Sequence, residues 1–147
     1  MGHFTTLFGY INCDEDFFEE NRESINALSA DDTWPYLTRD LFAAPNSEHS
    51  YDGQLITFGT IYNGVERVWE EWLNKFEKLL RTMHWSDAHV YLQTEWWGNY
   101  HYTWQFLIPN TASLMEDTTS PSSDHWDFFG GPRTRLRELY QDDKPNR

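Results

Sequence analysis

A chain of 147 residues with a formal net charge of −13 is long enough to form a single domain with a sizeable core. Its eight Trp, eight Tyr and ten Phe exclude the aromatic-poor composition that is typical of disordered acidic chains. The negative charge disfavours contact with nucleic-acid phosphates, so the composition favours a folded protein that binds a positively charged protein.

The first half of the chain predicts a strand, a helix and a long loop. Residues 3–12 are rich in β-branched and aromatic side chains, which favours a strand. Asp14 can cap a helix that begins at Glu15, and acidic residues suit the first turn of a helix. Residues 29–53 hold two prolines and several turn-forming residues, which predicts a long loop.

The second half predicts three more strands and a long helix. Residues 54–62 favour a second strand, and the apolar side chains of residues 65–83 recur with the period of an amphipathic helix. Residues 88–97 and 100–108 favour two strands joined by a two-residue Gly-Asn turn.

We therefore expect a single α+β domain over residues 1–132, with its elements in the order β-α-β-α-β-β. The expected architecture is a small four-stranded sheet with helices packed on one face. Residues 110–125 should form a surface loop. Residues 133–147 should form a short basic C-terminal helix and a flexible tail.

The register of the hairpin decides which of its side chains share a face. The two-residue turn places Trp97 opposite Tyr100, and side chains then alternate between the faces. One face mixes rings with polar groups and is a candidate partner-binding surface: Tyr91, Glu95, Trp97, Tyr100, Tyr102 and Trp104. In the alternative, rings of the C-terminal segment cover this face: Trp126, Phe128 and Phe129. The same register places His89 and His101 on opposite faces.

Acidic residues gather in the first half of the chain, where residues 1–66 hold twelve of them against two arginines. Negative charge of this kind speeds association with a basic partner, although it also serves plain solubility. The candidate steering residues are Asp14, Glu15, Asp16, Glu19, Glu20, Glu23, Asp31 and Asp32.

No compact catalytic or metal-binding pattern is present. The six histidines form no HExxH or comparable ligand spacing, and the single cysteine, Cys13, has neither a disulfide partner nor an evident base. A GxGxxG motif and a P-loop lysine are absent. The sequence therefore predicts no catalytic residue, metal or cofactor, although an enzyme whose site is assembled from distant residues stays open.

Targeting signals are also absent from the sequence. The N-terminus lacks the basic and apolar regions of a signal peptide, and no apolar run is long enough to cross a bilayer. We expect a cytoplasmic protein.

Three local features resemble the small acidic α+β immunity proteins of bacterial polymorphic-toxin and contact-dependent growth inhibition systems. They are LFGYI at residues 7–11, IYNG at residues 61–64 directly before a long helix, and the acidic loop MEDTTSPSSD near the end. The resemblance implies a non-enzymatic inhibitor that binds a cognate toxin domain and blocks its active site or substrate access. We expect the protein to be a monomer or homodimer. Many such toxins are nucleases with basic clefts. A binding module or subunit of a bacterial complex is the alternative.

Overall fold

The computed structural model describes residues 4–30, 32–44, 53–106, 126–134 and 136. Its strands are β1 (Phe4–Cys13), β2 (Phe42–Ala43), β3 (Gln54–Asn63), β4 (Trp85–Thr94), β5 (Asn99–Phe106) and β6 (Trp126–Gly130). Its α-helices are α1 (Phe18–Asn26) and α2 (Trp69–Leu80). Three short 3-10 helices are η1 (Glu15–Phe17), η2 (Arg39–Leu41) and η3 (Val65–Val68).

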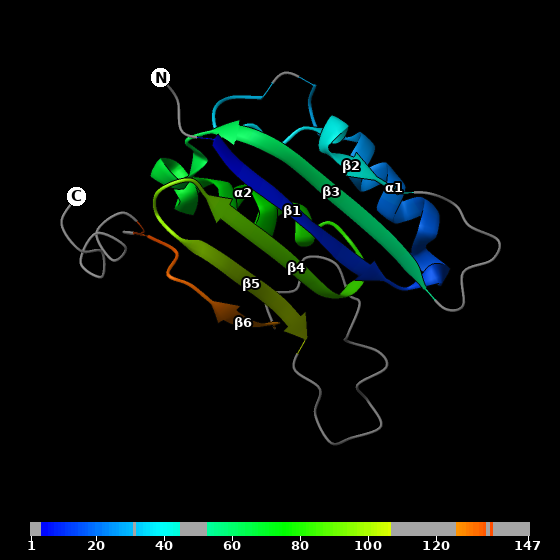
Figure 1. Cartoon of the computed structure of the whole chain (residues 1–147). Helices are drawn as coiled ribbons and strands as arrows, with labels where there is room; N and C mark the ends of the chain where they lie inside the picture. Colours follow the sequence, from blue (N-terminus) through cyan, green and yellow to red (C-terminus); the bar gives the residue numbers. More distant parts are fainter. Residues whose placement is uncertain (1–3, 31, 45–52, 107–125, 135, 137–147) are drawn as a thin grey trace.

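The strands form one six-stranded sheet in the order β2-β3-β1-β4-β5-β6, and every neighbouring pair is antiparallel (Figure 1). The chain is thus broadly α+β, but the expected four-stranded sheet is wrong. Two strands were missed. β2 has only two residues inside the expected loop, and β6 lies in a short glycine-ended aromatic segment with no clear alternation.

Both helices lie behind the sheet in Figure 1 and cover one of its faces, here called the inner face. The strands alternate accordingly: Leu7 and Ile11 of β1 are fully buried against the helices, whereas Phe8 between them is exposed on the outer face. This alternation is what the β-branched and aromatic pattern of β1 predicts.

Helix α2 supplies most of the helical side of the core. The left-handed Gly64 turns the chain out of β3, and the apolar stripe of the helix then faces the sheet. Trp72 and Phe76 are fully buried with their ring centroids 5.2 Å apart, and Phe76 lies 5.0 Å from Trp104 of β5. The Trp72 indole N–H donates to the Tyr62 hydroxyl at 3.1 Å, so this large ring is buried with its polar atom satisfied.

The segment after β6 is anchored to α2 through a buried carboxylate. Arg133 donates to both oxygens of Glu77 at 2.8 Å, and the indole N–H of Trp104 also donates to Glu77 at 2.8 Å. Leu136 is buried in the hydrophobic core. Arg133 and Leu136 therefore belong to the packed body of the protein, while residues 137–147 and the expected loop 110–125 lie outside the described residues.

Within the described ranges, neither helix combines the length and apolar character needed to traverse a bilayer.

Candidate functional site

The observed hairpin register differs from the expected one. Gln93 of β4 pairs with Asn99 of β5, and Val90 pairs with Tyr102, so the loop is longer than two residues. Thr94 closes this loop, because its backbone N–H donates to the Gly98 carbonyl at 3.1 Å and its hydroxyl accepts from a loop amide. The shift is an odd number of residues, and an odd shift moves every β5 side chain to the opposite face.

This shift removes most of the expected ring anchors from the surface. Tyr102 and Trp104 are fully buried on the inner face, Trp97 is 7% exposed, and Tyr100 packs half-buried against the core. The expected partner-binding face is therefore wrong for these four residues. Of that group, the half-buried Tyr91 is on the outer face, and Glu95 is exposed at the end of β4.

The alternative, in which rings of the C-terminal segment pack here, is correct for part of that segment. Phe128 of β6 lies 5.1 Å from Trp104, and Trp126 lies 5.7 Å from Trp85 of the core. Phe129 points the other way and is exposed on the outer face.

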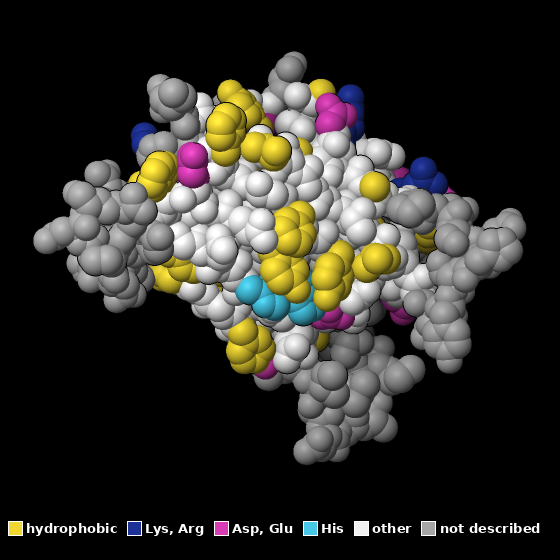
Figure 2. Space-filling view, viewed as in Figure 1, with side chains coloured by type: hydrophobic (Ala, Val, Ile, Leu, Met, Phe, Trp, Pro, Cys, Tyr) yellow, Lys and Arg dark blue, Asp and Glu magenta, His cyan; other side chains and the backbone are white. Residues whose placement is uncertain are grey.

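The outer face of the sheet, turned away from both helices, is the candidate site. It carries exposed apolar side chains, including Phe4 and Ile61 at 68% and 65% exposure. In Figure 2 apolar groups spread over this face around a pair of histidines, and Lys and Arg appear only at its margins. The six strands contain no Lys or Arg, and their two acidic residues are Asp87 and Asp127.

Five rings form a continuous stacked row across the middle of this face. Phe8 stacks on Tyr91 with centroids 5.0 Å apart, and Tyr91 stacks on His101 at 4.2 Å. His101 then faces His89 at 5.5 Å, and His89 stacks on Tyr10 at 4.7 Å. The row spans β1, β4 and β5, so the rings hold one another in place before any partner arrives.

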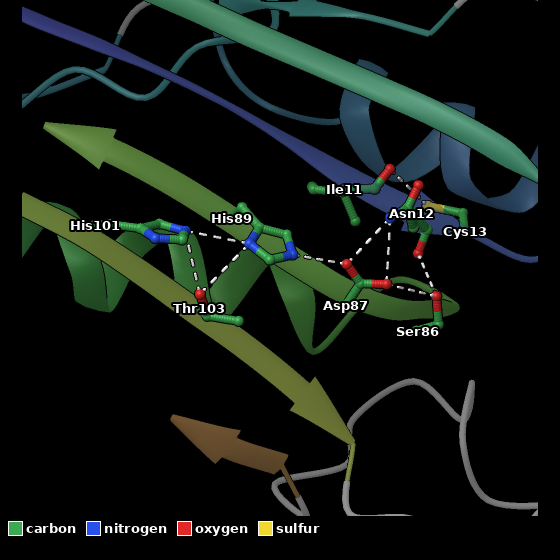
Figure 3. Close-up of polar contacts among 8 residues, drawn as sticks. All are labelled: Ile11, Asn12, Cys13, Ser86, Asp87, His89, His101 and Thr103. Carbon is green, nitrogen blue, oxygen red and sulfur yellow. Dashed lines mark hydrogen bonds and ion pairs between the residues drawn. The ribbon is translucent and has the colours of Figure 1, made fainter. Parts of the chain in front are cut away.

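A chain of polar contacts runs through the two histidines (Figure 3). The Asp87 carboxylate contacts His89 Nε2 at 2.9 Å, and His89 Nδ1 contacts His101 Nε2 at 3.2 Å. Thr103 Oγ1 lies 3.4 Å from His89 Nδ1 and 3.2 Å from His101 Nε2. Asn12 donates its amide to both oxygens of Asp87. The expectation that His89 and His101 occupy opposite faces is wrong, and its cause is the same register shift.

Metal-binding and thiol groups are the other chemistry to consider among the described residues. In the described part of the chain, no three His, Cys, Asp or Glu side chains gather so that they could hold a metal ion. Burial, with smaller contributions from Asp87 and Asp14, raises the pKa of Cys13 to about 12, so at neutral pH its thiol is not a nucleophilic thiolate.

The expected acidic cluster lies elsewhere. Four of its residues are exposed on η1 and α1, in the helix layer behind the outer face: Asp16, Glu19, Glu20 and Glu23. Asp14 accepts the Asp16 backbone N–H at 2.9 Å and caps η1. The Glu15 side chain and Asp31 lie outside the described residues. The structure therefore does not bring the acidic cluster and the ring row together.

Asp32 has a structural partner. It lines a groove of about 570 Å³ between α1 and α2, where it contacts the Lys75 ammonium at 2.9 Å and accepts the Leu37 amide at 2.8 Å. Burial opposes ionisation of this carboxyl, but the Leu37 amide and the Lys75 ammonium outweigh it and hold its pKa below the usual value. Lys75 also donates to the Thr33 and Pro35 carbonyls, so Asp32 and Lys75 together pin the loop onto α2.

Most residues of the outer face were not among the site residues predicted from the sequence. Phe4, Phe8 and Tyr10 alternate with buried residues in β1, and that alternation alone signals a second, outward set. His89 and His101 come together only through the hairpin register, for which the sequence favoured the wrong turn.

No family model, curated protein or solved structure matches this chain.

Proposed function

We propose that this protein is a non-enzymatic immunity protein that binds and neutralises a basic bacterial toxin domain through its outer sheet face. The observation that carries the proposal is the composition of that face: exposed apolar groups and stacked rings on strands that contain acidic residues but no Lys or Arg.

Exposed apolar groups supply the affinity in this proposal. Ile61 and Phe4 are largely exposed, and Phe8 and Tyr91 lie in the ring row beside them. A partner that covers such side chains removes much apolar surface area from contact with water. The row is already stacked in the free protein, so binding immobilises few additional rotamers.

Charge supplies the choice of partner. The net charge of −13 attracts a basic protein over distances longer than any contact. The exposed acidic residues of α1 contribute to this attraction, although they lie in the helix layer. A toxin domain whose cleft binds a nucleic-acid backbone has the complementary charge. Covering that cleft with an acidic protein blocks access of its substrate.

Co-purification from the protein's own host tests the proposal, with three baits. The first is the wild type. The second is Ile61→Ser on the outer face, and the third is Tyr36→Ser, which alters an exposed aromatic in the loop between α1 and η2. We expect one basic protein to be retained by the wild type and by Tyr36→Ser, and at least about tenfold more weakly by Ile61→Ser.

Growth then distinguishes an immunity protein from a subunit of a bacterial complex. The captured partner, expressed alone, should arrest growth, and co-expression of the wild-type protein should restore it. Equal retention by Ile61→Ser, or an acidic partner, contradicts the proposed surface. A partner that is harmless when expressed alone contradicts neutralisation and favours the complex subunit.

A further inference from the structure

The hydrogen bonds of the histidine pair fix where its protons lie at neutral pH. The Asp87 carboxylate can only accept, and the Asn12 amide already donates to it, so His89 Nε2 must carry the proton that points to Asp87. A neutral His89 then has a lone pair on Nδ1. The 3.2 Å contact between the rings therefore requires that His101 donates from Nε2.

This assignment leaves room for one additional proton and no more. The His101 Nδ1 atom can be protonated without loss of any of these hydrogen bonds. A second proton would have to enter between His89 Nδ1 and His101 Nε2 and would set two N–H groups against each other across 3.2 Å. The pair can therefore take up a single proton, at His101 Nδ1.

The surroundings determine what that proton changes. The titratable groups that contact the pair are Tyr10 from β1 and Asp87 and Tyr91 from β4. Asp127 of β6 lies on the same face, where it pairs with Gln105. Burial, followed by the neighbouring Tyr91 and Asp87, raises the pKa of Tyr10, so this group stays neutral under mildly acidic conditions. The centre of the face consists of the Asp87 carboxylate and the two imidazole rings. Uptake of one proton changes the net charge of this group from about −1 to about zero.

We propose that the outer sheet face releases its basic partner when the His89–His101 pair takes up one proton. The inference rests on the proposed function, because it concerns the same partner and the same surface. An imidazolium in the middle of the ring row opposes a positively charged partner, and covering it costs desolvation energy. Burial and the neighbouring His89 lower the pKa of His101, which places release on the acidic side of neutrality.

Two measurements test the inference, each with the wild type, His101→Gln and His84→Gln. Glutamine at position 101 keeps an amide donor toward His89 but cannot take up the proton. His84 serves as the control, because it stacks on Phe17 at 3.8 Å beside α1 and lies away from the outer face. The first measurement follows the histidine ring protons of the free protein by NMR between about pH 8 and pH 5.

The second measurement is the dissociation constant of the captured basic partner over the same pH range at constant ionic strength. In the wild type and in His84→Gln, we expect this constant to rise as the pH falls through the lowered pKa of His101. The rise should be at most about tenfold per pH unit, which is the limit for one linked proton. In His101→Gln the rise should be absent.

The outcomes separate the two proposals. If the free wild type shows two independent histidine titrations in the pair, or if His101→Gln follows the wild-type pH profile of binding, the proton-linked release is wrong while the proposed function stands. If no basic partner binds at neutral pH in the co-purification, the proposed function itself has failed.

Discussion

The buried carboxylate of Glu77 joins three elements, so its removal gives a sharp test of the packing. It accepts from the Trp104 indole of β5 and, through both oxygens, from Arg133 after β6. The change to test is Glu77→Ala, with Glu77→Gln as the intermediate case and Glu70→Ala, at an exposed position of α2, as the control.

The expected loss follows from what each substitution leaves unpaired. Breaking a buried ion pair typically costs about 3–5 kcal/mol, but the Arg133 side chain is 28% exposed and water recovers part of that cost. The Trp104 N–H, left without an acceptor in the core, adds about 1–3 kcal/mol. Together these effects predict a loss of about 3 kcal/mol for Glu77→Ala. Glutamine keeps an acceptor for Trp104, so Glu77→Gln should lose about half as much.

Urea denaturation followed by circular dichroism gives these free energies of unfolding. Adding Arg133→Ala completes a double-mutant cycle, in which we expect a coupling energy of about 1–2 kcal/mol between the two residues. If Glu77→Ala unfolds at the same urea concentration as Glu70→Ala, the anchor does not contribute to stability. If the cycle shows no coupling, the segment after β6 is not held by this ion pair.

Three further predictions concern the rest of the fold. Trp72→Ala should cost about 3–5 kcal/mol because its ring is fully buried, whereas Glu71→Ala on the exposed side of α2 should cost about 0.3 kcal/mol in the same denaturation assay. Gly9→Ala should cost about 3 kcal/mol, because the new methyl group would lie 2.0 Å from a carbonyl oxygen of β4. Gly59→Ala should cost less than about 1 kcal/mol, because the nearest atom to its new methyl group would be 3.3 Å away. Equal melting temperatures of the two variants would contradict this geometry. Asp32 has a lowered pKa, so its contribution to stability is complete above the ordinary carboxyl pKa of about 4 and is lost as the pH falls through the lowered value. Asp32→Asn should remove that part of the acid dependence of the unfolding free energy. An unchanged acid profile would show that the carboxylate is not stabilised in the fold.

The long elements could be predicted from the sequence because each carries its own periodicity. The stripe of α2 repeats over several turns, and its central Trp72 is buried as that stripe indicates. The strands β1 and β3 are ten residues long, rich in β-branched and aromatic residues, and end at clear turn signals.

The two short strands could not be predicted in the same way. β2 exists because Phe42 and Ala43 pair with β3, where the Phe42 ring lies 5.3 Å from Phe58 of the core. β6 exists because its residues continue the sheet beyond β5 and place Phe128 against the core ring of Trp104. Both depend on contacts between residues far apart in the chain, and neither segment is long enough to show a period.

The hairpin shows why a turn signal is weaker evidence than the burial pattern of the strands beside it. The Gly-Asn pair favoured a two-residue turn, but that register placed Gln93 on one face with Tyr102 and Trp104. The observed register gathers Leu92, Tyr102 and Trp104 on a single face, and burying three large apolar side chains together outweighs the preference of a two-residue turn. The same register turns the polar residues of both strands outward over the paired stretch from Ala88 to Gln93, because side chains alternate between the two faces there. The core therefore determines the composition of the outer face: once the tryptophan and tyrosine of β5 are buried, its histidine must stack beside that of β4 on the exposed side.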